Sequence, residues 1–213
     1  MKNYQILLLL IIINFSKTVK VGEIDKLPDP IKEGGMPLYE ALNQRKSSRD
    51  FDNSKKLNTE IISQALWCSY GINRPTKFKT VPSAKGWYPL LVYVFLEEGV
   101  FQYSAKDHHL LKILEGDYRA MTGTQTSVVT SARANFVFIA DFKKKSAMDG
   151  DDAHKLRSIY LDTGHVAMAL SLFAASNNMK GVDRAMVDAD PLLDLLQLNK
   201  EDYIFTLAFS LGY

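Results

Sequence analysis

Two arginines, one lysine and two serines follow one another in the segment Arg45-Lys46-Ser47-Ser48-Arg49. Guanidinium groups hold several N–H donors in a planar fork, and with hydroxyl groups they suit a phosphate or a heterocycle edge that carries carbonyl oxygens. Apolar residues at helical spacing precede the segment: Leu38, Ala41 and Leu42. A helix extending to Arg49 would carry both guanidinium groups on one side. The alternative is a solvated helix end whose basic side chains offset the helix dipole.

Small residues gather in a second segment, Pro82-Ser83-Ala84-Lys85-Gly86. Such residues permit close approach of the backbone to a planar ring, and Gly86 tolerates unusual backbone torsions. Trp87 and Tyr88 follow, and they either line a ligand slot or pack into the core.

Both segments resemble those of the nitroreductase-like flavoproteins. In that family an Arg-x-Ser-x-Arg/Lys segment leads into Phe-Asp, here Phe51-Asp52. The second segment is similar to the Pro-Ser-Ala-Gly-Gly-x-Tyr-Pro motif of the branch that includes the azoline oxidases, which oxidise thiazolines and oxazolines in peptides. Further matching blocks are Trp67–Arg74, Gly99–Tyr103, Tyr160–His165 and Ser210–Tyr213. The resemblance spans residues 36–213.

The resemblance implies FMN as the cofactor and a homodimer, because in the family the glycine-containing loop comes from the partner subunit. Arg45 and Ser47 would hold the FMN phosphate or ribityl chain, and Arg49 would face the N1–O2 edge. The segment with Ala185 and Met186 matches the one whose backbone N–H meets flavin N5. The complete implied set is Arg45, Lys46, Ser47, Arg49, Pro82, Ser83, Ala84, Lys85, Gly86, Gln125, Ala185 and Met186.

Ordinary alternatives remain for several of these residues. Ala185 and Met186 also suit a strand-to-helix turn, and Gln125 suits a solvated helix position. Lys85 stands where the branch commonly has glycine, so it adds a charge near the ring. Arg184 is a further candidate for the phosphate.

Most other catalytic arrangements are absent from the sequence. It holds no Gly-x-Ser-x-Gly elbow, no Gly-x-Gly-x-x-Gly after a strand and no Walker loop. A single cysteine, Cys68, excludes an internal disulfide and any zinc site built on paired thiolates. No metal site and no catalytic side chain is therefore assigned. This fits a flavoenzyme, in which the cofactor performs the redox chemistry and the protein binds and orients it.

The chain is divided into three parts by composition. Residues 1–16 combine a basic start with an apolar run of eight and resemble a signal peptide, or an uncleaved anchor, which predicts export to the periplasm or the extracellular space. Residues 17–35 read as a linker, and residues 36–213 as one domain. With a net charge of +2, composition gives no indication of a nucleic-acid partner.

The elements that must position these residues point to an α+β protein with a mixed or antiparallel sheet flanked by helices. Helices are expected at 58–70, 116–132 and 151–178, the last of them buried on most sides or at a subunit interface. Strands are expected at 90–96, 100–103, 135–140 and 203–211.

The sequence thus predicts an FMN-dependent oxidoreductase of nitroreductase type, in which a donor reduces flavin N5, leaves, and is replaced by an acceptor. NAD(P)H, a quinone or a partner redox protein are the candidate electron carriers. One alternative is a degenerate flavin-binding module, suggested by Lys85 and by the chain ending at Tyr213, where many relatives continue. Another is an azoline-type dehydrogenase, although no lysine–tyrosine pair associated with that chemistry can be placed.

Overall fold

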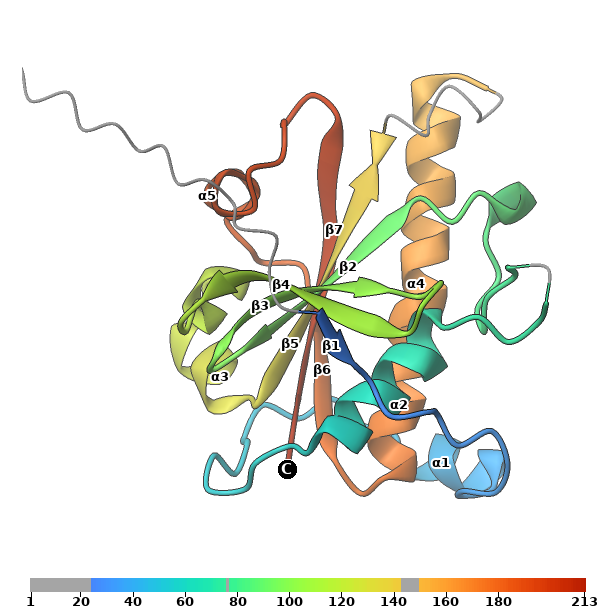
Figure 1. Cartoon of the computed structure of the whole chain (residues 1–213), viewed down its shortest axis with the longest axis vertical. Coiled ribbons are helices and arrows are strands. Elements are labelled where there is room, and N and C mark those ends of the chain that lie inside the picture. Colours follow the sequence, from blue (N-terminus) through green and yellow to red (C-terminus); the bar gives the residue numbers. More distant parts are fainter. Residues whose placement is uncertain (1–23, 76, 143–149) are drawn as a thin grey trace, which may run out of the picture.

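Apolar runs of the sequence form the central strands of a seven-stranded sheet in the computed structural model, which describes residues 24–75, 77–142 and 150–213 (Figure 1). Every neighbouring pair of strands is antiparallel, in the order β1-β4-β3-β2-β5-β7-β6. The strands are β1 (Ile24–Lys26), β2 (Leu90–Leu96), β3 (Gly99–Ser104), β4 (His109–Glu115), β5 (Ala134–Asp141), β6 (Lys180–Arg184) and β7 (Tyr203–Gly212). The predicted α+β class and strands are confirmed.

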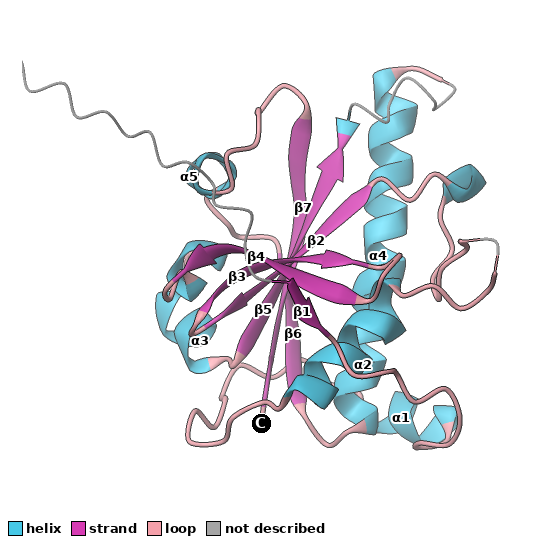
Figure 2. Ribbon diagram, viewed as in Figure 1, coloured by secondary structure: helices cyan, strands magenta, loops and turns pink. Residues whose placement is uncertain are grey.

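Helices cover both faces of the sheet, which explains why its central strands are apolar without alternation (Figure 2). One face carries α1 (Leu38–Gln44), α2 (Thr59–Tyr70) and α4 (Asp152–Ser176); the other carries the 3-10 helix η2 (Arg119–Thr122), α3 (Thr126–Ser131) and α5 (Ala189–Leu195). Val92 and Val94 of β2 pack in the first core, while Tyr93 and Phe95 pack in the second. Successive side chains of a strand thus fill opposite cores.

The two long helices begin where capping residues occur in the sequence. The Asn58 side chain accepts a hydrogen bond from the Ile61 N–H at 2.9 Å, and α2 ends at Tyr70, the limit expected from the sequence. Asp151 caps α4 by accepting from the His154 N–H at 2.8 Å. Asp151 is therefore the N-cap of α4.

One side of α4 packs on the sheet and the other side is exposed in the single chain. Val166, Leu170 and Phe173 are buried, whereas Tyr160, Leu161 and Met168 are 51%, 61% and 41% exposed. The helix expected to be buried on most sides therefore has an uncovered apolar strip. The position of His165 in this apolar segment predicts a core or interface histidine; it is exposed in the single chain, so the core position is wrong and the interface position stays a prediction.

Part of the predicted linker belongs to the sheet. Ile24–Lys26 forms the edge strand β1 beside β4, and Leu27 is 2% exposed. Pro28 is tied down as well, because its carbonyl accepts a hydrogen bond from the Ser63 hydroxyl at 2.6 Å. Residues 1–16 and the rest of the linker before Ile24 lie outside the described residues.

The helix predicted at 116–132 is broken in two, into η2 and α3. The break lies at Gly123, where a side chain would collide with the guanidinium group of Arg184. That guanidinium donates to the carbonyl of Thr122. The buried arginine thus uses a carbonyl that a continuous helix would have occupied.

Candidate functional site

The segment Arg45–Arg49 is extended and is not part of a helix. α1 ends at Gln44, and Arg45 has backbone angles of φ −59° and ψ 121°. Ser47 forms a parallel bridge with Gly181 of β6, and the Ser48 N–H donates to the Gly181 carbonyl at 3.0 Å. The predicted helical placement of Arg45 and Arg49 is therefore wrong, because pairing with β6 replaces the helical hydrogen bonds.

The extended segment presents cations and hydroxyl groups that have no partners within the described part of the chain. Arg45 is half-buried, while Lys46, Ser47 and Arg49 are exposed. None of the three cations forms an ion pair with a described residue. Arg45 does lie near Asp183. Desolvation raises the pKa of the Asp183 carboxyl above its ordinary value, and the charge of Arg45 offsets part of this rise. Such uncommitted donors are suited to a phosphate.

Three further predicted site residues lie at the far end of β6: Ala185, Met186 and Gln125. The Thr124 N–H donates to the Met186 carbonyl at 3.0 Å, which places Gln125 beside this end of β6. The Met186 side chain is 70% exposed, and within the described chain its N–H donates no hydrogen bond. Gln125 occupies the N-cap of α3 without capping it, and it is exposed.

Along an extended strand, Gly181 and Ala185 are about 13 Å apart. The structure therefore connects two groups of donors through one rigid strand. Arg45, Lys46, Ser47 and Arg49 lie beside its first half; Ala185, Met186 and Gln125 lie at its end.

Arg184 is not available to a phosphate, contrary to the sequence-based expectation. It is 7% exposed and donates to Ser210 Oγ at 2.9 Å and to Asn135 Oδ1 at 3.0 Å, as well as to Thr122. Burial lowers the pKa of this guanidinium to about 10. Every nitrogen of the fork is committed to the interior, so Arg184 holds β6, β7 and η2 together.

The Pro82–Gly86 loop lies elsewhere on the chain. Ala84–Gly86 forms the 3-10 helix η1, which Figure 1 shows beside the middle of α4, well separated from α1. No hydrogen bond or ion pair of the described residues joins this loop to the Arg45–Arg49 segment. One chain alone therefore does not assemble all the predicted site residues.

Backbone torsions in the loop are unusual. Lys85 and Tyr88 have φ values of 49° and 48°, and Gly86 has 69°. Only glycine adopts this left-handed region without cost. The loop nevertheless keeps this shape because hydrogen bonds hold it from several sides: Gly86 N–H to Ser83 O, Trp87 N–H to Ala84 O, and Lys79 N–H to Tyr88 Oη.

Asp162 of α4 holds the same loop and was missed by sequence reasoning. Its carboxylate accepts from the Ser83 hydroxyl at 2.5 Å and from the Ala84 N–H at 3.0 Å, and the residue is 5% exposed. A signal was present in the sequence. Asp162 shares a helical stripe with Ile159 and Val166, and an acid within an apolar stripe needs a buried partner.

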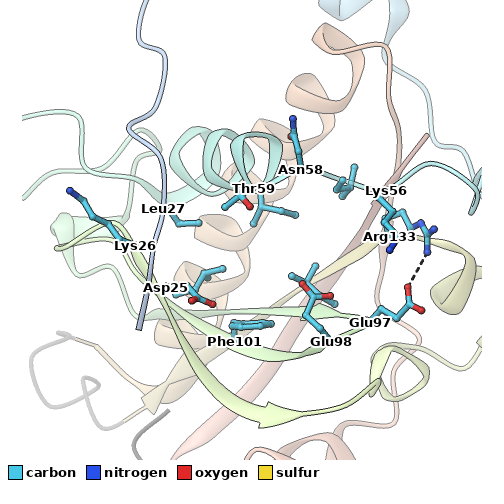
Figure 3. Close-up of a pocket in the computed structure, with 14 residues that line it drawn as sticks. Asp25, Lys26, Leu27, Lys56, Asn58, Thr59, Glu97, Glu98, Phe101 and Arg133 are labelled. Carbon is cyan, nitrogen blue, oxygen red and sulfur yellow. Dashed lines mark hydrogen bonds and ion pairs between the residues drawn. The ribbon is translucent and has the colours of Figure 1, made fainter. Parts of the chain in front are cut away.

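A cavity of about 800 Å³ lies away from all these residues, beside the start of α2 and the β2–β3 turn (Figure 3). Asp25, Phe101 and Glu98 line one side of it, and Arg133 lies opposite, in an ion pair with Glu97 at 3.3 Å. None of the predicted cofactor-binding residues lines this cavity.

Two features are not found among the described residues. No helix in this part of the chain has the length and apolar character of a membrane span. No cluster of three or more His, Cys, Asp or Glu side chains there is arranged to hold a metal ion. Cys68 is half-buried, and desolvation raises the pKa of its thiol, which keeps the thiol protonated and unreactive.

Comparison with known proteins gives a consistent result. A model of the nitroreductase family matches residues 42–213. A protein of Methanocaldococcus jannaschii, provisionally named as a nitroreductase, is 28% identical over 82% of this chain and 90% of its own. A crystal structure from Ralstonia eutropha JMP134, provisionally of the same kind, has a TM-score of 0.82 and 30% identity, covering 89% of this chain and 88% of that one.

More distant solved structures share the fold. The Escherichia coli microcin synthetase McbBCD complex, with truncated pro-MccB17 bound, contains a chain with a TM-score of 0.70 and 17% identity, covering 80% of this chain and 69% of that one. A Desulfovibrio desulfuricans structure in complex with FMN has a TM-score of 0.60 and 17% identity, covering 84% and 87%. The match to the family model over residues 42–213 and the 30% identity to the Ralstonia eutropha structure show that the chain belongs to the nitroreductase family.

Proposed function

We propose that this protein is an FMN-dependent oxidoreductase that works as a homodimer. The observation that carries the proposal is the strand β6: within the described part of the chain, the cations along its first half form no ion pair and the Met186 N–H at its end donates no hydrogen bond. When bound, FMN supplies the redox chemistry by accepting and donating a hydride at N5. A relative of the same fold was solved with FMN bound, which supports this choice of cofactor.

The residues present fit that cofactor. Arg45, Lys46 and Ser47 offer charge and a hydroxyl group to the phosphate and ribityl chain. The Met186 N–H offers a donor to N5, and Arg49 offers a cation that would stabilise negative charge at the N1–O2 edge. No side chain of the site is needed as an acid or base, so we assign none.

The second subunit would supply the remaining part of the site. The uncovered strip of α4 (Tyr160, Leu161 and Met168) and the exposed Leu38 and Leu42 of α1 offer apolar area for a dimer. In such a dimer the Pro82–Gly86 loop of the partner subunit would cover the ring bound along β6. This arrangement explains why one chain holds the two groups of residues apart.

Absorbance of the purified protein tests the proposal. We expect a flavin spectrum near one FMN per chain, either as isolated or after addition of FMN, and its loss in Arg45→Ala. Thr130→Ala serves as a control, because this half-buried residue of α3 lies outside the predicted set. A protein that remains colourless with excess FMN would contradict the proposal.

A second experiment identifies the electron donor of the protein. NADH, NADPH, reduced quinones and small redox proteins are to be mixed with the FMN-loaded protein without oxygen, and bleaching of the flavin band identifies the donor. If only dithionite bleaches the flavin, the degenerate flavin-binding module is the better description of the protein.

An azoline-type dehydrogenase is a second candidate, supported by the fold shared with a chain of the microcin synthetase complex. A peptide carrying a thiazoline would then lose two hydrogen atoms to FMN and become a thiazole. Mass spectrometry of such a peptide after incubation with the FMN-loaded protein measures this loss. An unchanged peptide mass would remove the candidate.

Export of the protein is part of the proposal and rests on residues 1–16, which lie outside the described residues. Cell fractionation together with N-terminal sequencing tests it. An intact Met1 in the cytoplasmic fraction would contradict export and would make NAD(P)H the simplest donor.

A further inference from the structure

We infer that Asp162 is a positioning residue for the proposed flavin site, and that it acts across the subunit boundary through the Pro82–Gly86 loop. The inference rests on the proposed function, because it assigns a role toward FMN. Among the described residues, the Asp162 carboxylate accepts hydrogen bonds from the loop of its own chain, so its effect would be felt in the site of the partner subunit that this loop covers.

The hydrogen bonds at Asp162 define the path of the loop. One carboxylate oxygen accepts from the Ser83 hydroxyl at 2.5 Å, and the other accepts from the Ala84 N–H at 3.0 Å. Ser83 Oγ in turn accepts from the Tyr88 N–H at 2.9 Å. The two ends of the Ser83–Tyr88 segment are therefore fixed to one buried carboxylate on α4.

The hydrogen bonds to Asp162 explain the strained backbone of the Ser83–Tyr88 segment. Lys85 and Tyr88 lie in the left-handed region, a conformation that residues with a side chain adopt only when the surroundings impose it. A rigid helix that holds Ser83 and Ala84 supplies such surroundings. Without it, the loop would relax toward ordinary torsions and change the surface that it offers to a planar ring.

The position on α4 gives the anchor a second consequence. Tyr160 and Leu161 precede Asp162 directly and are exposed on the uncovered strip of the helix. One helix would therefore contact the partner subunit with one side and hold the loop with the other. The loop, already shaped by Asp162 within its own chain, would reach the site of the partner subunit once the two chains have associated through α4.

Three variants separate this role from simple stability. Asp162→Ala removes both acceptors together with the carboxylate, Asp162→Asn keeps the volume and one acceptor, and Ser83→Ala removes the bridging hydroxyl while Asp162 keeps the hydrogen bond from the Ala84 N–H. Thr163→Val is the matched control, since Thr163 is equally buried on α4 and its hydroxyl bonds only the Ile159 carbonyl. We expect FMN affinity to fall about tenfold in Asp162→Ala, less in Asp162→Asn, and not in Thr163→Val.

A spectroscopic readout follows the loop without cofactor. Trp87 lies next to the loop, and the chain has only one other tryptophan, Trp67. In a Trp67→Phe background, acrylamide quenching of Trp87 should rise in both Asp162→Ala and Ser83→Ala. Unchanged quenching in both variants would overturn the positioning role.

Mixed dimers test the action across the boundary. Chains carrying Arg45→Ala and chains carrying Asp162→Ala are co-expressed with different tags, and the mixed dimer is isolated. Action across the boundary leaves one site with both defects and one intact site, so the mixed dimer should bind FMN at half the wild-type stoichiometry with wild-type affinity. Weakened binding at both sites would show that Asp162 acts within its own chain and would overturn the inference.

The proposed function and the positioning role of Asp162 are contradicted by different outcomes. If wild-type protein does not bind FMN, the proposed function fails. If wild-type protein binds FMN and Asp162→Ala binds it equally well, the proposed function stands and the positioning role is wrong.

Discussion

Arg184 at the end of β6 and Arg45 beside the start of β6 use the same guanidinium group in opposite ways. Arg184 is buried, and its nitrogens donate to Ser210, Asn135 and Thr122. Arg45 lies beside β6 with no ion pair among the described residues, near exposed lysine and serine neighbours. A committed guanidinium stabilises the fold, while an uncommitted one is free to bind a ligand. The sequence alone does not distinguish them; their partners in the structure do.

The largest expected effect is the loss of stability in Arg184→Met. This change leaves the buried Thr122 carbonyl without its donor and removes one of the two donors to Asn135 Oδ1, which should lower the free energy of unfolding by about 3 kcal/mol. Urea unfolding of the cofactor-free protein measures it. Arg45→Met is the matched comparison, with an expected change below about 0.5 kcal/mol. Equal losses in the two variants would break the comparison.

The second expected effect concerns FMN binding by Arg45→Ala. Loss of a charged hydrogen bond to phosphate should weaken FMN binding about 10- to 100-fold while unfolding stays unchanged. Fluorescence titration with FMN gives the dissociation constant. Titration with riboflavin, which lacks the phosphate, is the control: its affinity should be nearly the same in both proteins. A variant that binds FMN as the wild type does would place the phosphate elsewhere.

A smaller effect is expected at the uncovered strip of α4. Leu161 is 61% exposed in the single chain, so Leu161→Lys should leave the chain folded. If the strip lies in a dimer interface, the lysine charge should weaken dimerisation about tenfold or more. Sedimentation velocity over a range of concentrations measures this. The control is Leu198→Lys, a half-buried position on the opposite face of the sheet. Unaltered dimers in Leu161→Lys would move the interface away from α4.

The smallest effect is a pH dependence far from both arginines. Burial lowers the pKa of His108 below its ordinary 6.5, partly opposed by a hydrogen bond with the Pro28 carbonyl. Since the unfolded chain binds the proton more readily, the stabilising contribution is complete above pH 6.5 and is lost as pH falls from 6.5 through the lower folded pKa. Thermal unfolding between pH 7.5 and pH 5 should show this loss.

In His108→Gln the slope over that pH range should be reduced, whereas in Arg45→Ala it should persist. A slope that disappears in Arg45→Ala would mean that the cofactor-binding region and the His108 region are coupled, contrary to the separation seen in the structure.

Local patterns predicted those elements whose hydrogen bonds and packing are local. The cap at Asn58 and the stop at Gly71 gave the limits of α2, and the apolar runs gave β2, β5 and β7. Elements imposed by distant partners were missed. The Arg45–Arg49 segment is extended because it pairs with Gly181, and the helix at 116–132 is broken because Arg184 takes the carbonyl of Thr122.

The candidate site shows the same division. Resemblance pointed to Arg45, Ser47, Gln125 and Met186, and the structure places them along β6. No motif in the sequence assigned a role to Asp162, although an acidic residue within an apolar helical stripe was a signal. Its role became visible only through the two hydrogen bonds to Ser83 and Ala84.

A crystal structure of the protein with FMN bound tests the central claim most directly. The account predicts a dimer with the FMN phosphate against Arg45 and Ser47, the flavin N5 near the Met186 N–H, and the Pro82–Gly86 loop of the partner subunit over the ring. FMN bound within a monomer, or in the cavity between Asp25 and Arg133, would contradict it.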